Sequence, residues 1–259
     1  HQLLMDIRIL TAAELDEAIS LAKEVILSET DTSWSKEAAK SISEFIAERL
    51  NQFIVYGLYE EGLESILAYD SEKMHIILLL TKQDSRKKGY ATALLNHLKE
   101  EADKNRLSKI TANVVDSAAD FYHHYGFEDA GTSTEAGGMN YTPMEYLVGR
   151  EWLGKTVTVI IDHTYGSFHP HIADLTYPVN TGYVEELFQK SGEFQDAYII
   201  GPKEPLDTFK GVVSGIIYHK DDHRSYFIVT RVTEKIDKNE IIQDVGFEQQ
   251  FYETRILWK

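Results

Sequence analysis

Residues 84–95 read DSRKKGYATALL, and only Lys82 and Gln83 separate them from the apolar run IILLLT of residues 76–81. Together the two stretches predict a strand, a short turn and a helix that begins near Gly89 and continues to about Lys104. The first backbone N–H groups of a helix have no partner within the helix, and they lie at the positive end of its dipole. Because Gly89 adds no side chain there, this helix start predicts a pocket for a diphosphate group.

The segments on either side have the periodicity of a mixed α/β domain. Thr11 to Glu14 form a capping box ahead of an amphipathic helix, and the apolar period becomes alternating from residue 53. In chain order we expect helices after Glu14 and after Ser35, strands at 53–60, 63–70 and 74–81, the helix at 89–104, a strand at 110–115, a short helix at 117–127 and a hairpin that ends in a strand at 139–148.

After Gly149 the pattern changes to short strands and turns, followed by one closing helix. Strands in a row with a single terminal helix predict a small β-barrel or sandwich. We therefore expect an α/β (α+β) chain of two domains, residues 1–148 and residues 149–259. The strands expected in the second domain are at 157–162, 166–174, 197–201, 211–219 and 225–232, and the terminal helix is expected at about 238–252.

The composition of the chain limits which cellular environments and which binding partners we expect for it. The chain has no cysteine, which excludes disulfides, cysteine-ligated zinc and a cysteine nucleophile and favours a cytoplasmic location. A net charge of -16 argues against nucleic acid or an anionic membrane as partner. No apolar run approaches the roughly 20 residues that span a bilayer. We expect residues 1–4, ahead of Met5, to be a remnant of expression, and no signal-peptide pattern follows them.

Residues 5–147 resemble the GNAT family of N-acetyltransferases. The resemblance rests on Arg86-x-x-Gly89-x-Ala91 after a central strand and on the pattern A-x-x-x-Y-x-x-x-G-F of residues 118–127. It implies direct transfer of an acetyl group from acetyl-CoA to a small-molecule or peptide amine, without a metal.

The same resemblance implies roles for individual residues. Backbone groups of Leu79 and Thr81 would hold the pantetheine arm, and Tyr122 would protonate the leaving thiolate. The resemblance leaves the general base unassigned; Glu72 and His75, both at the start of the central strand, are the candidates by position, and a solvated strand end explains each of them as well. The diphosphate would be bound by the loop Arg86, Lys87, Lys88, Gly89, Tyr90, Ala91 and Thr92.

The second domain resembles soluble inorganic pyrophosphatases, which are five-stranded barrels whose carboxylates hold magnesium ions against pyrophosphate. The matching residues are Asn180, Tyr183, Glu193, Asp196, Asp221 and Asp222. Ser191 and Glu193 stand where that family has aspartates, and Thr181 replaces a tyrosine. His163 replaces an arginine, and the later lysine is missing from the segment after Asp222. We call the six matching residues the pyrophosphatase-like frame and interpret them as the remnant of a phosphate and metal site. We expect magnesium as a cofactor only if the barrel is active.

Three functions remain open from the sequence. The first is an N-acetyltransferase with an inactive, pyrophosphatase-like domain that binds a ligand or regulates, where the ligand is phosphate, a nucleotide or a CoA-like anion. The second is a bifunctional protein with magnesium-dependent diphosphatase activity. The third is a non-catalytic sensor of CoA or phosphate.

Two further points concern ligands and partners. The group His219, Asp221, Asp222 and His223, or the group His163, His169 and His171, is an alternative metal site, although an exposed hairpin turn explains the first group equally well. The acidic surplus favours a polyamine or a lysine-like amine as acceptor, and the hairpin ending at residues 139–146 could pair with a second copy in a homodimer.

Overall fold

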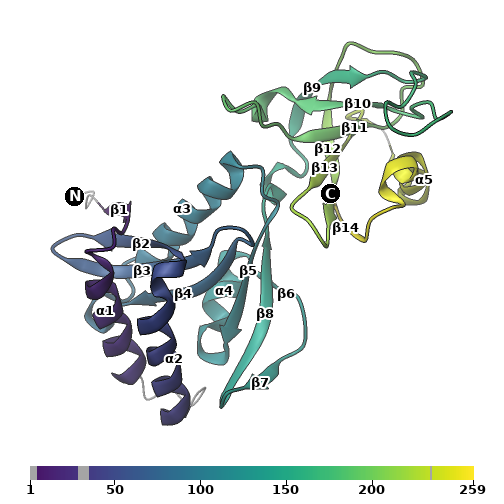
Figure 1. The fold of residues 1–259 in the computed structure, drawn as a ribbon. Coiled ribbons are helices and arrows are strands. Elements are labelled where there is room, and N and C mark those ends of the chain that lie inside the picture. The colour runs from purple at the N-terminus through teal and green to yellow at the C-terminus, as the bar shows by residue number, and fades with distance from the viewer. Residues whose placement is uncertain (1–4, 29–34, 234) are drawn as a thin grey trace. The chain divides into compact units, whose positions relative to one another are not determined.

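The computed structural model describes residues 5–28, 35–233 and 235–259, so the expectation for residues 1–4 lies outside the described residues. The chain forms two compact units (Figure 1). The first contains residues up to Ala102 together with Lys109–Leu147, and the second contains Asp103–Ser108 and Val148–Lys259. In the part of the chain that the structure describes, no helix is long and apolar enough to cross a membrane.

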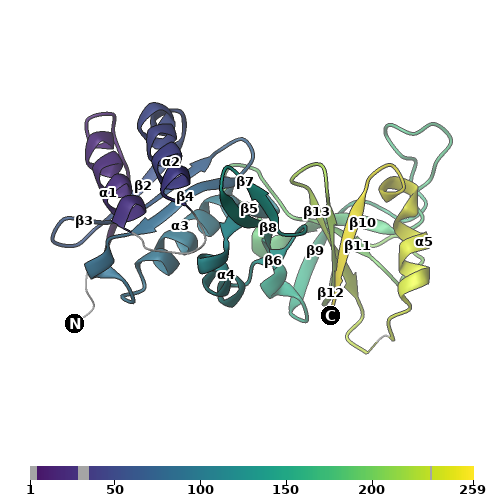
Figure 2. The ribbon, with the colours of Figure 1, turned by 90° about the horizontal axis from the view of Figure 1, so that it is seen from below.

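The first unit is an eight-stranded mixed sheet with helices on both faces. The strands follow the order β1-β2-β3-β4-β5-β8-β6, and β7 pairs with β8. Helices α1 and α2 cover one face, and α3 and α4 lie on the other (Figure 2). The elements are β1 Asp6–Ile9, α1 Leu15–Ser28, α2 Lys36–Arg49, β2 Ile54–Tyr59, β3 Leu63–Asp70, β4 His75–Thr81, α3 Tyr90–Lys104, β5 Lys109–Val115, α4 Ala119–Tyr125, β6 Glu128–Asp129, β7 Thr134–Ala136 and β8 Met139–Leu147.

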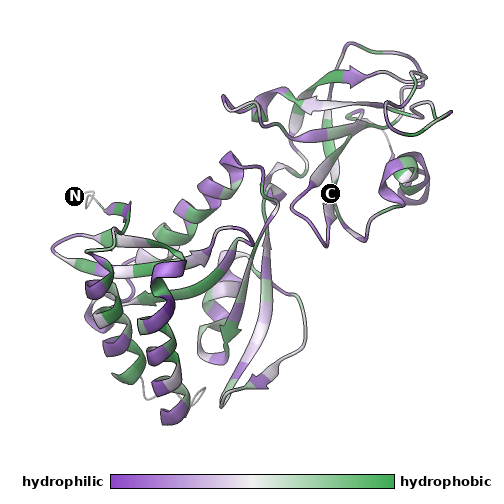
Figure 3. Cartoon of the chain, viewed as in Figure 1, coloured by the Kyte–Doolittle hydropathy of each residue, from purple (hydrophilic) through white to green (hydrophobic). Residues whose placement is uncertain are grey.

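Local signals explain where α1 and α2 begin. The backbone N–H of Thr11 donates to Glu14 Oε1 at 3.1 Å, and Ser35 Oγ accepts from the backbone N–H of Ala38 at 3.1 Å. Each helix turns an apolar stripe toward the sheet (Figure 3), and these stripes form one core with β2, β3 and β4. The expected helices and strands of this unit are confirmed, but β1 and β6 were not expected.

The second unit contains a closed five-stranded barrel. Its strands follow the order β13-β11-β10-β9-β12, and β12 also pairs with β13, which closes the ring. Helix α5 contributes Ile241, Val245 and Phe247 to a core shared with the barrel strands. The elements are β9 Thr156–His163, β10 Asn180–Val184, β11 Asp196–Ile199, β12 Thr208–His219, β13 Ser225–Thr230, α5 Lys238–Gln249 and β14 Thr254–Trp258.

Two expectations for this unit were wrong. Helix α5 is not the terminal element, because β14 follows it and pairs with β12 over Gly215–His219. Residues 166–174 form a loop with one isolated bridge, Phe168 to Thr176, and not a strand. The loop is stabilised locally, since His169 Nδ1 accepts from the backbone N–H groups of His171 and Ile172 at 3.1 Å each, which replaces pairing with a neighbouring strand.

Candidate functional site

The central feature of the first unit is the separation of β4 from β5. The two strands pair in parallel only at His75 with Thr111 and at Ile76 with Ala112. Beyond that point β4 carries one extra residue, Ile77, relative to β3, which is a β-bulge. The strands therefore diverge and leave a gap in the sheet.

Backbone groups of β4 point into this gap. The N–H of Lys82 donates to the carbonyl of Glu64, near the start of β3, at 2.9 Å. Because backbone groups alternate sides along a strand, those of Thr81 and Leu79 face away from β3, toward β5. Among the described residues β5 offers them no ladder partner, so they are available to a ligand.

A pocket of about 400 Å³ passes through the gap. It joins the face covered by α2 to Tyr122 on α4, on the other side of the sheet. No carboxylate stands among the described residues that line it. The lining residues are Ile26, Ile42, Phe45 and Ile46 from the helices, residues 75–80 of β4, residues 112–115 of β5, Ala118, Tyr122, Met139 and Tyr141.

Tyr122 is held at the pocket by the end of α4. Gly126 has a φ of 123°, which permits the chain to reverse, and the ring of Phe127 packs against that of Tyr122 with centroids 5.0 Å apart. Only 7% of Tyr122 is exposed, and burial raises the pKa of its phenol. The hydroxyl therefore remains protonated at neutral pH and can donate a proton.

The two candidate bases lie in different places. His75 lines the pocket, and its Nδ1 is 2.8 Å from Thr111 Oγ1. Burial lowers the pKa of His75, Asp70 opposes that shift, and Lys73 adds to it, so the ring is neutral at pH 7 and can accept a proton. Glu72 is exposed in the turn after β3 and does not line the pocket.

The start of α3 has the conformation expected of an anion site. Lys87 and Gly89 have φ values of 62° and 81°, and a Cβ added at Gly89 would meet nothing within 4 Å. The side chains of Arg86, Lys87, Lys88 and Thr92 are exposed, whereas Ala91 is half-buried. Tyr90 is buried, and the hydrogen bond of its hydroxyl to Glu60 raises its pKa to about 12. Tyr90 can therefore offer a ligand only its backbone.

The structure does not bring the pyrophosphatase-like residues together. Asp196 lines a pocket of the barrel, and the other members of the frame lie outside it. Asn180 is fully buried and ties two loops together, because its Oδ1 accepts from the backbone N–H of Tyr165 at 2.8 Å and its Nδ2 donates to the carbonyl of Glu204 at 2.8 Å. Its role is structural.

The remaining members of the frame occupy surfaces and turns. The ring of Tyr183 packs against Phe188 and Phe194, with centroids 5.6 and 5.3 Å away. Glu193 and Asp221 are exposed. Asp222 accepts from the backbone N–H of Arg224 at 2.8 Å, which shapes the turn between β12 and β13.

The histidines do not form the alternative metal sites. His219 Nδ1 is 3.0 Å from Asp222 and its Nε2 is 2.8 Å from Gln249 Oε1, so both ring nitrogens are engaged. His163 and His169 each stack on Tyr177. Across residues 5–28, 35–233 and 235–259 no group of three or more His, Asp or Glu side chains is arranged to hold a metal ion.

Sequence reasoning missed residues that tertiary packing brings to the two pockets. In the first unit these are Phe45, Met139 and Tyr141. Phe45 offered one signal, since it lies outside the apolar stripe of α2 and remains 40% exposed. In the barrel they include Asp162 and Glu248, which no motif marked.

Comparison with known proteins identifies the first unit. A family model described as an acetyltransferase (GNAT) domain matches residues 16–148, and the chain belongs to this family of acetyltransferases. A search of curated proteins gives no match.

Several solved structures are similar to part of the chain. A GCN5-related N-acetyltransferase from Rhodopseudomonas palustris is 18% identical, covers 55% of this chain and 94% of its own, and has a TM-score of 0.49. The paiA N-acetyltransferase from Thermoplasma acidophilum, solved with coenzyme A, is 17% identical over 55% of this chain and 98% of its own, with a TM-score of 0.46. The ribosomal-protein-S18-alanine N-acetyltransferase from Escherichia coli is 17% identical over 56% of this chain and 94% of its own, with a TM-score of 0.43.

Proposed function

We propose that the domain of residues 1–148 transfers an acetyl group from acetyl-CoA to an amine that carries an apolar body. The observation that carries this proposal is the pocket between β4 and β5, which connects an apolar wall on one face of the sheet to Tyr122 on the other. Membership of the GNAT family supports an acyltransferase, and the geometry of the gap supports a role for each residue below.

The residues of the first unit fit acetyl-CoA. The N–H groups that follow Gly89 and the exposed side chains of Arg86, Lys87 and Lys88 suit its diphosphate. Backbone groups of Leu79 and Thr81 can form hydrogen bonds with the amides of its pantetheine arm, as an added strand does at the edge of a sheet. When bound, this cosubstrate would supply the thioester carbonyl that the amine attacks.

The transfer then needs three groups of this chain. The amine nitrogen forms a bond to the carbonyl carbon while the bond from that carbon to sulfur breaks. A backbone N–H of β4 near the bulge at Ile77 stabilises the oxygen as it gains negative charge. His75 takes the proton that leaves the nitrogen, and Tyr122 gives a proton to the departing sulfur.

The lining of the pocket favours a particular class of amine. A polyamine needs carboxylates to hold its second and third charges, and the described residues that line this pocket provide none. Ile42, Phe45 and Met139 instead offer apolar contact to the body of the acceptor. We therefore propose an arylalkylamine or alkylamine in place of the polyamine that the net charge favours.

The test is release of thiol from acetyl-CoA with a panel of amines. We expect kcat/KM for 2-phenylethylamine to exceed that for spermidine by about tenfold or more, because only the first can bury its body against apolar side chains. The variant Phe45→Glu should lose most of that preference. Phe188→Glu, an equally conspicuous exposed phenylalanine in the second unit, is the matched control and should retain it.

Other outcomes of the panel are equally informative. Equal or better turnover of spermidine would contradict the apolar acceptor. Stabilisation by acetyl-CoA with no turnover of any amine would contradict the transferase and favour a non-catalytic sensor of CoA.

The role of His75 predicts a pH profile. Because burial lowers its pKa, the neutral ring persists to lower pH than that of an ordinary histidine, and kcat at saturating amine should fall only below the ordinary histidine range. His75→Gln should lower kcat by about tenfold and remove this acid limb, a modest loss because solvent can also accept the proton. The measurement is kcat against pH for native protein, His75→Gln and the control Glu72→Gln. Loss of the limb in Glu72→Gln alone would assign the base to Glu72.

For the domain of residues 149–259 we propose a pyrophosphatase-like barrel that binds a ligand without hydrolysing pyrophosphate. The closed ring of five strands supports the barrel, and the scattering of Glu193, Asp221 and Asp222 around it supports the loss of hydrolysis. A cytoplasmic location and a homodimer remain predictions.

A further inference from the structure

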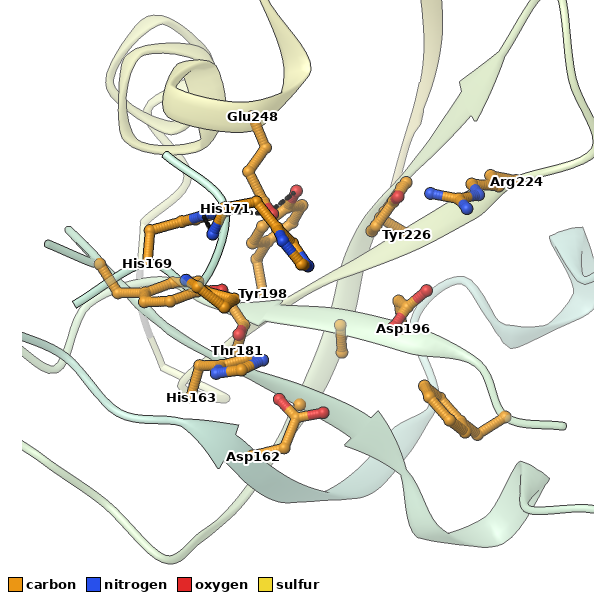
Figure 4. A pocket seen from close by; sticks show the side chains of 15 residues that line it. Asp162, His163, His169, His171, Thr181, Asp196, Tyr198, Arg224, Tyr226 and Glu248 are labelled. Atoms are coloured by element: carbon orange, nitrogen blue, oxygen red, sulfur yellow. Dashed lines mark hydrogen bonds and ion pairs between the residues drawn. The ribbon is translucent and has the colours of Figure 1, made fainter. Parts of the chain in front are cut away.

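The barrel contains a second pocket, of about 450 Å³. This volume falls in the range of about 300–1,000 Å³ that small-molecule sites occupy. Side chains reach it from β9, β10, β11 and β13, from the loop of residues 169–177 and from α5 (Figure 4). Such convergence from many elements is typical of a binding site and not of a surface depression.

A bulge in β9 gives the pocket two neighbouring polar side chains. Thr181 of β10 pairs with His163 and Gly182 pairs with Ile161, so Asp162 is the extra residue. In a regular strand adjacent side chains point to opposite faces. The bulge instead allows Asp162 and His163 to line the same pocket.

Aromatic rings form the walls. Tyr177 lies between two imidazoles, with its centroid 4.8 Å from that of His163 and 5.1 Å from that of His169, both stacked. Tyr198 and Tyr226 stack at 5.4 Å. Tyr177 and Tyr198 are only 3% and 1% exposed because these neighbours cover them. The half-buried Tyr226 is therefore the tyrosine that can offer apolar surface and a negative π-face, which attracts a cation.

Three carboxylates line the pocket, and one of them is fixed in place. Glu248 reaches down from α5 toward the strands that carry Asp162 and Asp196 (Figure 4). Its Oε1 accepts from the Tyr198 hydroxyl at 2.8 Å, and its Oε2 is 3.3 Å from Nε2 of His169, a side chain that is only 7% exposed. Gln249 Nε2 donates in turn to the Tyr198 hydroxyl at 2.8 Å. The position of Glu248 is therefore set before a ligand arrives.

The second carboxylate, Asp196, is half-buried and makes no side-chain hydrogen bond or ion pair with another described residue. Burial raises its pKa to about 7, with further contributions from the charges of Asp162 and Glu248, whereas Arg224 opposes the shift. Burial and Glu248 also raise the pKa of Asp162. The three acidic groups thus repel one another across one space, and a positive charge there would relieve that repulsion.

The lining argues against an anion and against a metal ion. Arg224 is its one guanidinium, and the described residues around the pocket include no lysine. Pyrophosphate would therefore meet three carboxylates with little to compensate them. Within the described ranges no three metal-binding side chains converge on a common point.

We propose that this pocket binds an organic ammonium ion with an aromatic or apolar body, held by Asp196 and Glu248 at its charge and by the ring of Tyr226 at its body. This assignment gives a ligand class to the barrel that we propose as a binding module. It does not depend on acetyl transfer by the first unit.

The test is calorimetric titration of the full chain with benzyltrimethylammonium, a cation that has no N–H to acetylate. We expect saturable binding by the native protein, and no binding of the uncharged probe benzyl alcohol. Asp196→Asn keeps the shape of the side chain and should weaken binding by about tenfold or more. Asp221→Asn, which removes an exposed carboxylate of the same barrel outside the pocket, is the matched control and should bind like native protein.

The same variants separate the alternatives. Equal affinity for benzyl alcohol, no difference between Asp196→Asn and Asp221→Asn, or no binding of the cation would overturn the proposal. Binding of magnesium pyrophosphate or of zinc chloride that Asp196→Asn abolishes would also overturn it, while leaving the barrel a binding module. Release of phosphate from magnesium pyrophosphate, lost in Asp196→Asn, would make the barrel a diphosphatase and contradict the binding module itself.

Discussion

Replacing Tyr122 by phenylalanine is expected to lower kcat for acetyl transfer by about 10²- to 10³-fold, because the departing sulfur then loses its proton donor. The KM for acetyl-CoA should change little, since the ring and its packing against Phe127 remain. Burial raises the pKa of Tyr122, so the native hydroxyl stays protonated throughout the assay range. The kcat of the native protein should therefore not fall with rising pH below the ordinary tyrosine pKa. The measurement is thiol release at saturating acetyl-CoA against pH.

The matched control for this variant is Tyr125→Phe. Tyr125 lies on the same helix, is half-buried, and its hydroxyl donates to Asn96 Oδ1 at 2.8 Å outside the pocket. It should retain nearly full activity. A Tyr122→Phe enzyme within threefold of the native rate would show that solvent or another group protonates the sulfur.

The largest expected effect on stability comes from Gly182→Ala in the barrel. A Cβ at Gly182 would lie 1.9 Å from the carbonyl oxygen of Ile160 and 2.9 Å from Cα of Ile161, where β10 crosses the bulge of β9. Because both obstructing atoms belong to the backbone, the strands must separate. We expect a loss of about 3 kcal/mol or more in the stability of the barrel.

The measurement is amide hydrogen exchange in the peptides that contain β9 and β10, since a chain of two units need not unfold in one step. Gly246→Ala is the matched control. Gly246 is in α5, and an added Cβ there would meet nothing within 4 Å, so the variant should gain up to about 1 kcal/mol from helix propensity. Native-like protection in Gly182→Ala would mean that β9 and β10 are not packed as described.

The fold of the first unit could be predicted from sequence because the residues that begin its helices act through local interactions. Ser35 caps α2, and Gly89 begins α3, each by interactions within one turn. β1 could not be predicted, because it has four residues and three of them are exposed. The same limit applied to β14, whose five residues are all half-buried and carry no clear alternation.

The residues of the candidate sites differ in the same way, because some are marked by local sequence and others reach a pocket only through tertiary packing. Tyr122 and His75 could be selected from sequence because they stand at fixed positions relative to a motif or a strand start, and both line the first pocket. Phe45 could not, because its position depends on how α2 packs over the sheet. Asp162 reaches the barrel pocket through a bulge, and an extra residue in a strand leaves no mark in the residue pattern.

The closure of the barrel has a consequence for how fast the chain folds. β2, β3 and β4 pair through short turns, so their contacts form between near neighbours in the chain. The barrel ring also needs β9 to pair with β12, which brings Ile160 to Thr208 across a long intervening segment. Loop-closure entropy opposes that contact, and domains rich in such distant pairings fold slowly. The second unit is therefore expected to form later than the β2–β4 meander, and until it does, its apolar strand β12 can pair with its near neighbour β13 but lacks β9.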